Sequence, residues 1–258
     1  MQNDLTAEAV TRGLNTRFIG QNVLYYQNVT STMALAKEEA LAGAAEGTVV
    51  LAEEQSAGRG RLERRWVSPP GCIALSVVLY PQPSELPSLI MVASLAVANA
   101  IEAITGLKPG IKWPNDVRLN GKKVCGILVD SGQSADGKTY AVIGIGINAN
   151  VKAADIGPVL QPATSLYDEL GSEISRLEIV RQLLTEIERL YLSLKEGDEV
   201  YRQWRYNLET LGKRVSADAG DIVFEGLADD VDEDGHLAII LDDGSLIFLA
   251  AGDVTLQG

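Results

Sequence analysis

The sequence changes character at Gly212, and no other feature constrains the fold as strongly. Before this glycine, apolar runs typical of buried strands alternate with helical patterns. After it, short β-prone segments alternate with turns rich in Gly and Asp, which is typical of a small β-barrel of about 45 residues. A chain of 258 residues has room for both units. The sequence therefore predicts a large α+β domain followed by a small all-β domain.

Charge is divided at the same place. The chain has a formal net charge of -13, and its last 44 residues hold 11 of the 35 acidic residues and no Lys or Arg. Residues 1–214 are therefore nearly neutral, with 24 acidic residues against 22 basic ones. An acidic tail repels nucleic acid, because affinity for DNA rests on Lys and Arg that neutralise phosphates. The charge pattern predicts that the protein has no DNA partner.

The apolar and cysteine content indicates a cytoplasmic protein without a membrane span. The chain is 46% hydrophobic and 22% charged, as ordinary soluble globular proteins are. No basic and apolar signal opens the sequence. Its most apolar stretch, residues 86–100, is shorter than the ~20 apolar residues of a spanning helix, so we expect a buried helix there. Cys72 and Cys125 lie in apolar runs without a CxxC pattern, which is typical of reduced core residues.

Strands and helices are predicted in mixed order over the first 211 residues. Asn120 and Gly121 mark a tight turn between two strands of an antiparallel three-strand meander. The helical patterns rest on apolar residues that recur on one face. We expect an apolar run at 48–53, strands at 72–79, 111–119, 123–131 and 140–148, and helices at 85–105, 176–195 and 200–211.

A cluster of positive charge lies in the middle of this acidic chain. Four arginines occur in the nine residues from Gly58 to Trp66. Glycine lets the backbone come close to a ligand, and arginine offers a planar fork of donors that matches carboxylate and phosphate oxygens. Tryptophan adds a flat face for a ring. The segment therefore predicts a loop over a small acid joined to a nucleotide; a solvated basic surface loop is the alternative.

Residues 111–117 form the second informative segment. Pro114 cannot donate to a strand ladder, and it biases Trp113 toward an extended conformation. Asn115 and Asp116 then point to a triphosphate bound with Mg²⁺, which prefers oxygen ligands and water. A bulge and turn at the end of a strand is the alternative.

The next segment begins with a lysine. Lys123 opens a strand that is otherwise apolar, so its side chain can reach a carboxylate inside a pocket. Gly126 on the same strand allows close approach of a ligand. A solvated lysine at a strand entry is the alternative.

Two glycine motifs have simpler interpretations. Residues 144–148 begin like a dinucleotide fingerprint, but the third glycine and the following helix are missing. They predict a tight strand against which a ligand or another backbone packs. Residues 230–235 begin like a calcium loop but lack its final glutamate and its flanking helices, so we expect a hairpin turn. His236 follows this turn and is the only histidine, which excludes chemistry based on several histidines.

Taken together, these segments resemble the biotin–protein ligases, also called biotin–[acetyl-CoA-carboxylase] ligases. The resemblance covers most of residues 17–258, and the order and spacing of the segments make it specific. The matching segments are Ser31-Thr32, Gln55 with Gly58 to Trp66, Lys112 to Asp116, Lys123 to Val129, Gly144 to Asn148, and Ala163 to Leu166. The resemblance implies a central mixed sheet flanked by helices, related to class II aminoacyl-tRNA synthetases, and a small SH3-like barrel. It implies an N-terminal extension at 1–16, a catalytic domain at 17–211 and the SH3-like domain at 212–258.

The resemblance also implies an activity and its partners. Biotin and MgATP give biotinoyl-5′-AMP, and a lysine of the biotin carboxyl carrier protein of acetyl-CoA carboxylase then receives the biotin. The reaction implies Mg²⁺ as cofactor and a cytoplasmic location. Some family members carry an N-terminal DNA-binding domain, and the residues before Arg17 are too few for one. The sequence leaves the oligomeric state open between monomer and homodimer.

The family's functional residues can be placed on this chain. The implied catalytic residues are Lys123, which would bridge the biotin carboxylate and the α-phosphate, and Arg59 and Arg61. The implied biotin site is Ser31, Thr32, Gln55, Gly58, Arg59, Lys123 and Gly126. The implied ATP and adenylate site is Arg61, Arg64, Trp66, Asn115 and Asn148. The implied metal ligand is Asp116.

Two alternative functions stay open at this point. A lipoate–protein ligase shares the fold and the adenylate chemistry. A regulator that binds biotin without catalysis is favoured by Glu63, because the family loop usually has glycine at that position. If the position requires a positive φ, Glu63 costs about 1 kcal/mol.

Overall fold

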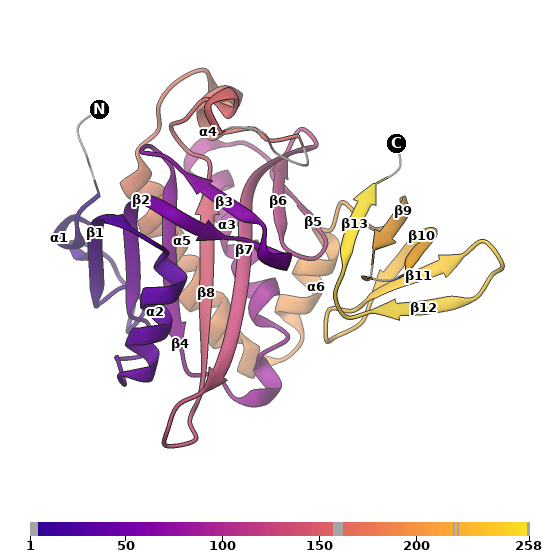
Figure 1. Ribbon diagram of the computed structural model, residues 1–258, viewed down its shortest axis with the longest axis horizontal. Helices are drawn as coiled ribbons and strands as arrows, with labels where there is room; N and C mark the ends of the chain where they lie inside the picture. The colour runs from indigo at the N-terminus through magenta and orange to yellow at the C-terminus, as the bar shows by residue number, and fades with distance from the viewer. Residues whose placement is uncertain (1–4, 157–161, 219, 221, 257–258) are drawn as a thin grey trace.

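The computed structural model describes residues 5–156, 162–218, 220 and 222–256. Within these residues, an eight-stranded sheet flanked by helices is followed by a separate five-stranded sheet (Figure 1). The two sheets correspond to the large and the small unit that the change at Gly212 predicts. The predicted fold class is thereby confirmed, while the domain boundaries stay a prediction.

The large sheet is mixed. Its order is β1-β2-β4-β8-β7-β6-β5, and β3 pairs with β2 beside this path. β1 and β2 are parallel, and the other neighbours are antiparallel. The strands are β1 (Val23–Val29), β2 (Val49–Arg59), β3 (Arg65–Ser68), β4 (Ile73–Leu79), β5 (Gly110–Lys112), β6 (Asp116–Leu119), β7 (Lys122–Gln133) and β8 (Thr139–Ile147).

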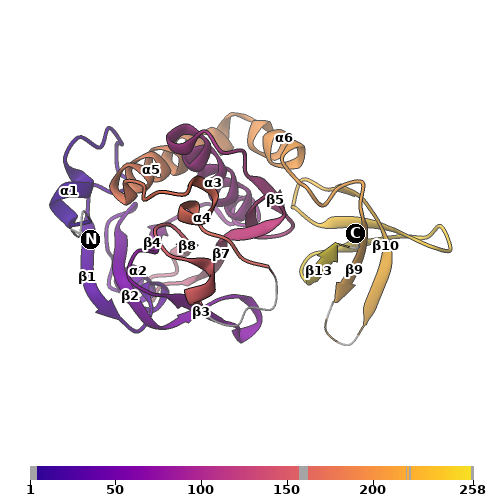
Figure 2. The ribbon, with the colours of Figure 1, turned by 90° about the horizontal axis from the view of Figure 1, so that it is seen from above.

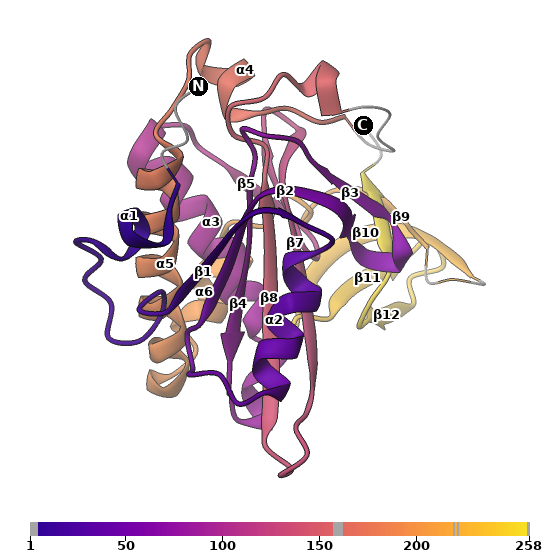
Figure 3. The same cartoon turned by 60° about the vertical axis from the view of Figure 1, so that its left-hand side comes forward.

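Helices cover both faces of this sheet. All seven residues of β4 are buried, because Leu75 and Val77 face the main core with α3 and α5, whereas Val78 faces α2. Figures 1 and 3 show α2 across the sheet from α3 and α5. The helices are α1 (Ala7–Thr11), α2 (Thr32–Leu41), α3 (Leu89–Thr105), α4 (Leu166–Leu170), α5 (Arg176–Ser193) and α6 (Glu199–Tyr206).

Two helix predictions need correction at their ends. α3 begins at Leu89 rather than at residue 85, because a 3-10 turn over Pro83–Glu85 and the proline at position 87 precede it. It ends before Gly106, whose φ of 72° is left-handed. α6 ends at Tyr206 rather than at residue 211. The chain then turns toward the C-terminal sheet.

The strand predicted over 111–119 is wrong, because two strands form there. β5 and β6 pair as a hairpin, with Trp113, a cis Pro114 and Asn115 in the turn between them. A proline in this stretch prevents continuous ladder bonding, and the turn projects the residues on either side of it into one region. The meander β6-β7-β8 is antiparallel as predicted, and Asn120 and Gly121 form its tight turn with positive φ.

The C-terminal sheet is antiparallel, with strand order β12-β11-β10-β9-β13. The hairpin turn predicted at residues 230–235 is confirmed: the Asp232 carboxylate accepts hydrogen bonds from the backbone N–H groups of Asp234 and His236. The strands are β9 (Arg214–Asp218), β10 (Val223–Val231), β11 (Leu237–Leu241), β12 (Leu246–Leu249) and β13 (Asp253–Leu256).

The same turn joins the two sheets. The indole Nε1 of Trp113 donates to the carbonyl of Gly235 at 2.8 Å, inside the protein. The Tyr201 hydroxyl donates to the carbonyl of Val231 at 2.7 Å. Figure 2 shows the C-terminal sheet beside β5 and α6 as a result. Among the described helices, none is both long and apolar enough to cross a membrane.

Candidate active site

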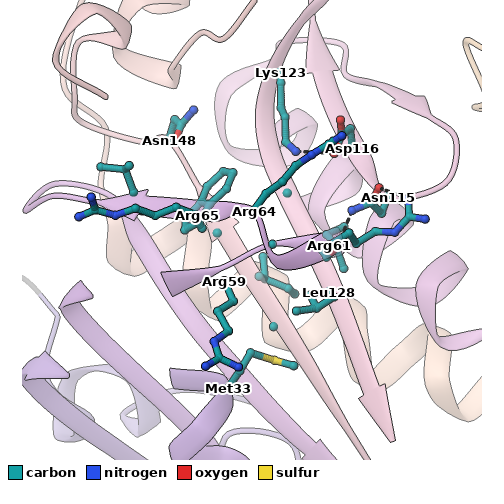
Figure 4. Close-up of a pocket in the computed structure, with 18 of the residues that line it drawn as sticks. Met33, Arg59, Arg61, Arg64, Arg65, Asn115, Asp116, Lys123, Leu128 and Asn148 are labelled. Atoms are coloured by element: carbon teal, nitrogen blue, oxygen red, sulfur yellow. Dashed lines mark hydrogen bonds and ion pairs between the residues drawn. The ribbon is translucent and has the colours of Figure 1, made fainter. Parts of the chain in front are cut away.

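A cavity of about 450 Å³ lies on the face of the large sheet that carries α2, between the β2–β3 hairpin and the β5–β6 turn (Figure 4). The structure describes every residue that the sequence assigned to a site, and Gly58 alone of these does not line the cavity. Gly58 pairs with Trp66, and a Cβ there would lie 2.6 Å from the Trp66 carbonyl oxygen. The predicted residues that line the cavity are Ser31, Thr32, Gln55, Arg59, Arg61, Arg64, Trp66, Asn115, Asp116, Lys123, Gly126 and Asn148.

The arginine cluster lies on a strand hairpin rather than on a loop. β2 runs to Arg59, a 3-10 turn covers Arg61–Glu63, and β3 returns. The Gly60 N–H closes the turn on the Arg64 carbonyl at 2.7 Å. The left-handed residue is Leu62, with φ 53°, and Glu63 is not in that conformation. The cost predicted for a positive φ at Glu63 therefore does not arise, because the residue with the positive φ is Leu62.

Two arginines of the hairpin contact the C-terminal sheet. Arg61 donates to the Asn115 Oδ1 at 3.2 Å and to the Gly252 carbonyl at 3.1 Å. Arg64 forms an ion pair with Asp253, the first residue of β13. Burial lowers the pKa of Arg61, because its charged form loses water. Asp253 lines the cavity. The sequence did not predict this position, because the segment around Asp253 is acidic and was not expected to take part in an anion site.

Both polar atoms of the Asn115 side chain form hydrogen bonds at this corner of the cavity. Its Oδ1 accepts from Arg61, and its Nδ2 donates to the Ile127 carbonyl at 2.8 Å. The Ile127 N–H in turn donates to the Asn115 carbonyl at 3.1 Å. The β5–β6 turn and β7 are thereby tied to the arginine hairpin.

Lysines form the adjoining part of the wall. The Lys123 Nζ lies 2.6 Å from the Asp116 Oδ1 and 5.5 Å from the centroid of the Trp66 ring. Lys112 is 5% exposed, and burial lowers its pKa to about 8 even though Asp116 opposes the shift. The sequence assigned no role to Lys112; its position between a strand and a proline turn was the signal that could have identified it.

Trp66 packs against two glycines. A Cβ at Gly146 would lie 2.4 Å from the indole of Trp66, and a Cβ at Gly126 would lie 3.0 Å from it. The glycines of β8 therefore make room for a side chain, and both also line the cavity, so the predicted close approach of a ligand stays a prediction. Trp66 Nε1 and Asn148 Oδ1 are buried without a hydrogen-bond partner among the described residues. Since Asn148 Nδ2 donates to the Thr164 carbonyl, its Oδ1 is left to accept from a ligand.

The other end of the cavity is polar, and Figure 4 shows Arg59 beside Met33 there. Thr32 donates to the Gln55 Oε1 through its N–H at 2.9 Å and its hydroxyl at 3.1 Å, and Gln55 donates to Ser68. Ser31 is the N-cap of α2, accepting from the Ala34 N–H. Figure 4 shows Met33 and Leu128 away from Lys123 and Asn148.

Met33 belongs to this end and was not predicted as a site residue. It lines the cavity beside Thr32, and a Cβ at Gly144 would lie 2.4 Å from its sulfur. A hydrophobic side chain therefore occupies the space above Gly144, as Trp66 does above Gly146.

The geometry defines a class of protein. One end of the cavity offers hydrogen bonds to a polar ring, and the other gathers cations that suit a carboxylate and phosphates. An acid can thus be held with its carboxylate beside a nucleotide, as an acid-activating ligase requires. No three His, Cys, Asp or Glu side chains among the described residues are placed to bind a metal ion together.

Comparison with known proteins identifies the family within this class. The Biotin/lipoate A/B protein ligase family profile matches residues 23–148, and the biotin protein ligase C terminal domain profile matches residues 210–256. The chain is 35% identical to the bifunctional ligase/repressor BirA of Bacillus spizizenii, over 93% of this chain and 76% of that protein. It is 35% identical to the biotin–[acetyl-CoA-carboxylase] ligase of Paracoccus denitrificans, over 81% and 90%.

A solved structure agrees with these relatives. The biotin protein ligase from Aquifex aeolicus, in complex with biotin and ATP, superposes with a TM-score of 0.78 at 31% identity, over 92% of this chain and 99% of that one. The chain therefore belongs to the biotin protein ligase family, as its sequence motifs predicted.

Proposed function

We propose that this protein is a cytoplasmic biotin–[acetyl-CoA-carboxylase] ligase. It forms biotinoyl-5′-AMP from biotin and MgATP and transfers the biotin to a lysine of the biotin carboxyl carrier protein. The observation that carries the proposal is the single cavity that joins the Thr32–Gln55 hydrogen-bond pair to the Lys123–Arg61 cationic end. The relative from Paracoccus denitrificans, which has this name, supports the choice of carrier.

The first step brings two anions together. A biotin carboxylate oxygen attacks the α-phosphorus of ATP, the bond from that phosphorus to the bridging oxygen breaks, and pyrophosphate leaves with the electron pair. Lys123 lies between Asp116 and the Trp66 face, from where its ammonium can touch both the carboxylate and the α-phosphate. Arg61 is assigned to the same anions, and Arg59, which lies beside Met33 in Figure 4, is assigned to the biotin part of the intermediate. Charged donors preorganised for developing charge are commonly the largest single contribution to such a step.

The nucleotide is assigned to the end of the cavity with unpaired polar atoms. Among the described residues, Asn148 Oδ1 is a buried acceptor without a partner, which suits the amino group of adenine. Trp66 offers its ring for stacking. Arg64 is assigned to a phosphate, which would replace Asp253 as its anion. Asn115 acts by holding Arg61 in place.

Biotin is assigned to the polar end. Its ureido ring needs paired donors and acceptors once it is buried, and Ser31, Thr32 and Gln55 supply both. Gly126 lines the cavity and lets Trp66 and Lys123 lie close to β7 beside this site. Gly58 contributes through the tight β2–β3 pairing that places Trp66.

The residues present fit Mg²⁺ bound mainly through the nucleotide. Mg²⁺ keeps several waters and takes one or two carboxylates together with substrate phosphates. Asp116 is the carboxylate we assign to it, with one oxygen already 2.6 Å from Lys123. When bound, Mg²⁺ would neutralise phosphate charge.

In the second step the acceptor lysine completes the reaction. Its neutral amine attacks the carbonyl carbon of the mixed anhydride, a C–N bond forms, and the C–O bond to phosphate breaks. AMP leaves with the electron pair, and the nitrogen loses one proton to give the amide. Arg61, which touches both Asn115 and Gly252, is placed to hold the anhydride until the amine arrives.

Biotin-dependent ATP–pyrophosphate exchange tests this proposal, with lipoate as a parallel substrate. Exchange with biotin alone is the expected result. Exchange with lipoate alone would overturn the assignment of the polar end and favour a lipoate ligase. Biotin binding without exchange would point to a regulator that does not catalyse the reaction.

A further inference from the structure

A second, smaller groove lies next to the main cavity, with a volume of about 200 Å³. Ile90 of α3 and Val129 of β7 line it from the catalytic domain. Ala250 and Ala251, which connect β12 to β13, line it from the C-terminal domain. Figure 1 shows this connection on the side of the C-terminal sheet that faces the catalytic domain. The groove shares Arg61 and other residues with the main cavity, so the two are continuous.

The size and lining of the groove limit what can occupy it. Pockets for small ligands usually have about 300–1,000 Å³, so this groove is too small for a second nucleotide or a second ring system. Its two domain walls are apolar. One extended aliphatic side chain fits such a space.

An apolar stripe leads to the groove along β12. Leu246 and Phe248 are 52% and 56% exposed, and they share a face because side chains alternate along a strand. β12 ends at Leu249, and Ala250, the next residue of the chain, lines the groove. Among the described residues β12 pairs only with β11, so it is an edge strand. An exposed apolar row on an edge is a typical site for another protein to dock.

Charge indicates what docks there. The last 44 residues carry 11 acidic side chains and no Lys or Arg, which attracts a cation and repels another acidic surface. A second copy of this chain would bring two such surfaces together. A lysine combines a cationic head, which the acidic domain attracts, with four methylene groups that fit an apolar groove.

We propose that the groove is the entrance for the acceptor lysine of the carrier protein, which docks along the Leu246–Phe248 stripe. This inference rests on the proposed function and names the route of its second substrate. The amine must arrive beside Arg61 and Asn115, where the groove and the main cavity meet.

The apolar walls also prepare the nucleophile. A lysine in water has a pKa near 10.4 and is charged at neutral pH, but the attack requires the neutral amine. Apolar surroundings lower the pKa of an ammonium because the charged form loses its water. Burial has this effect on Lys112 in the neighbouring cavity, where the pKa falls to about 8.

The test is to fill the groove without changing the main cavity. Ala250→Phe adds a ring at an exposed position of one wall, and Ala42→Phe makes the same change at the exposed C-cap of α2 as a control. Pyrophosphate exchange measures adenylation, and single-turnover transfer to a purified biotin carboxyl carrier domain measures the second step. Hydroxylamine, a small nucleophile that needs no docking surface, measures access to the anhydride through the main cavity.

We expect Ala250→Phe to keep exchange and the hydroxylamine reaction within about twofold of wild type, and to slow transfer to the carrier at least tenfold. Ala42→Phe should change none of the three. Ala250→Leu, a smaller addition, should give an intermediate loss of transfer.

Two results would overturn the inference. Transfer within twofold of wild type in both Ala250 variants would mean that the lysine enters elsewhere. Equal losses of exchange and transfer in both variants would mean that the groove serves the nucleotide. If the wild-type chain itself lacks exchange with biotin, the proposed function fails and takes the inference with it.

Discussion

The two ends of the main cavity are built in different ways. The polar end rests on Thr32 and Gln55, which bond to each other within the catalytic domain at ordinary distances. The cationic end depends on the C-terminal domain as well, since Arg61 reaches Gly252 and Arg64 reaches Asp253. A neutral network can keep its shape with or without a ligand. Clustered cationic side chains need an anion nearby. Asp253 is the anion that the protein supplies to Arg64, and a substrate phosphate has to replace it.

Removing Lys123 should have the largest effect and break the cationic end. Lys123→Ala should lower pyrophosphate exchange by about 100-fold or more, because one preorganised charged donor is worth about that much. Lys122→Ala is the matched control, since this neighbour is exposed and does not line the cavity. Near-normal exchange in a folded Lys123→Ala variant would remove Lys123 from the mechanism.

The second-largest effect should be the pH dependence of kcat/KM for ATP. Burial lowers the pKa of Lys112 to about 8, so this lysine is charged below that pH and neutral above it. We expect the charged form of Lys112 to bind an ATP phosphate in the cavity that this lysine lines, so kcat/KM for ATP should fall about tenfold between pH 7 and pH 9. Lys112→Arg should move the fall to higher pH, since arginine stays charged. A profile that is flat from pH 7 to 9 in the wild-type chain would contradict the role of Lys112.

A change at the polar end should be smaller and selective. Gln55→Ala removes the acceptor of Thr32 and the donor to Ser68. We expect KM for biotin to rise about fivefold, since neutral hydrogen bonds contribute about 0.5–1.5 kcal/mol each. KM for ATP should stay within twofold. If both constants rose together, the two ends would not be separate sites.

The smallest effect should come from the ion pair between the domains. Asp253→Asn removes the carboxylate that competes for Arg64. A partly exposed pair is worth about 0.2–1 kcal/mol, so KM for ATP should fall by no more than about fivefold, and less at high salt. A rise in KM for ATP would instead mean that Asp253 holds Arg64 in its working position.

Much of the fold could be predicted because helices and tight turns depend largely on residues that are close together in the sequence. The apolar stripe of α5, the turn at Asn120 and the hairpin at Asp232 follow from helix periodicity and turn chemistry. The strand prediction failed at Pro114, where one residue changes how the strands on either side of it pair. Pro114 divided a predicted strand into β5 and β6, and no periodicity marks where the chain turns back.

The sequence by itself determined which chemical groups take part. The order of its motifs indicated the family, the residue types indicated an anion site, and the family resemblance implied a polar ring site beside it. Tertiary structure decided how they meet. It placed Trp66 on Gly146, paired Arg64 with a residue 189 positions away, buried Lys112, and opened the groove between Val129 and Ala250. The physical reason is that burial, ion pairing and cavity shape depend on side chains from distant segments, which only the folded chain brings into contact.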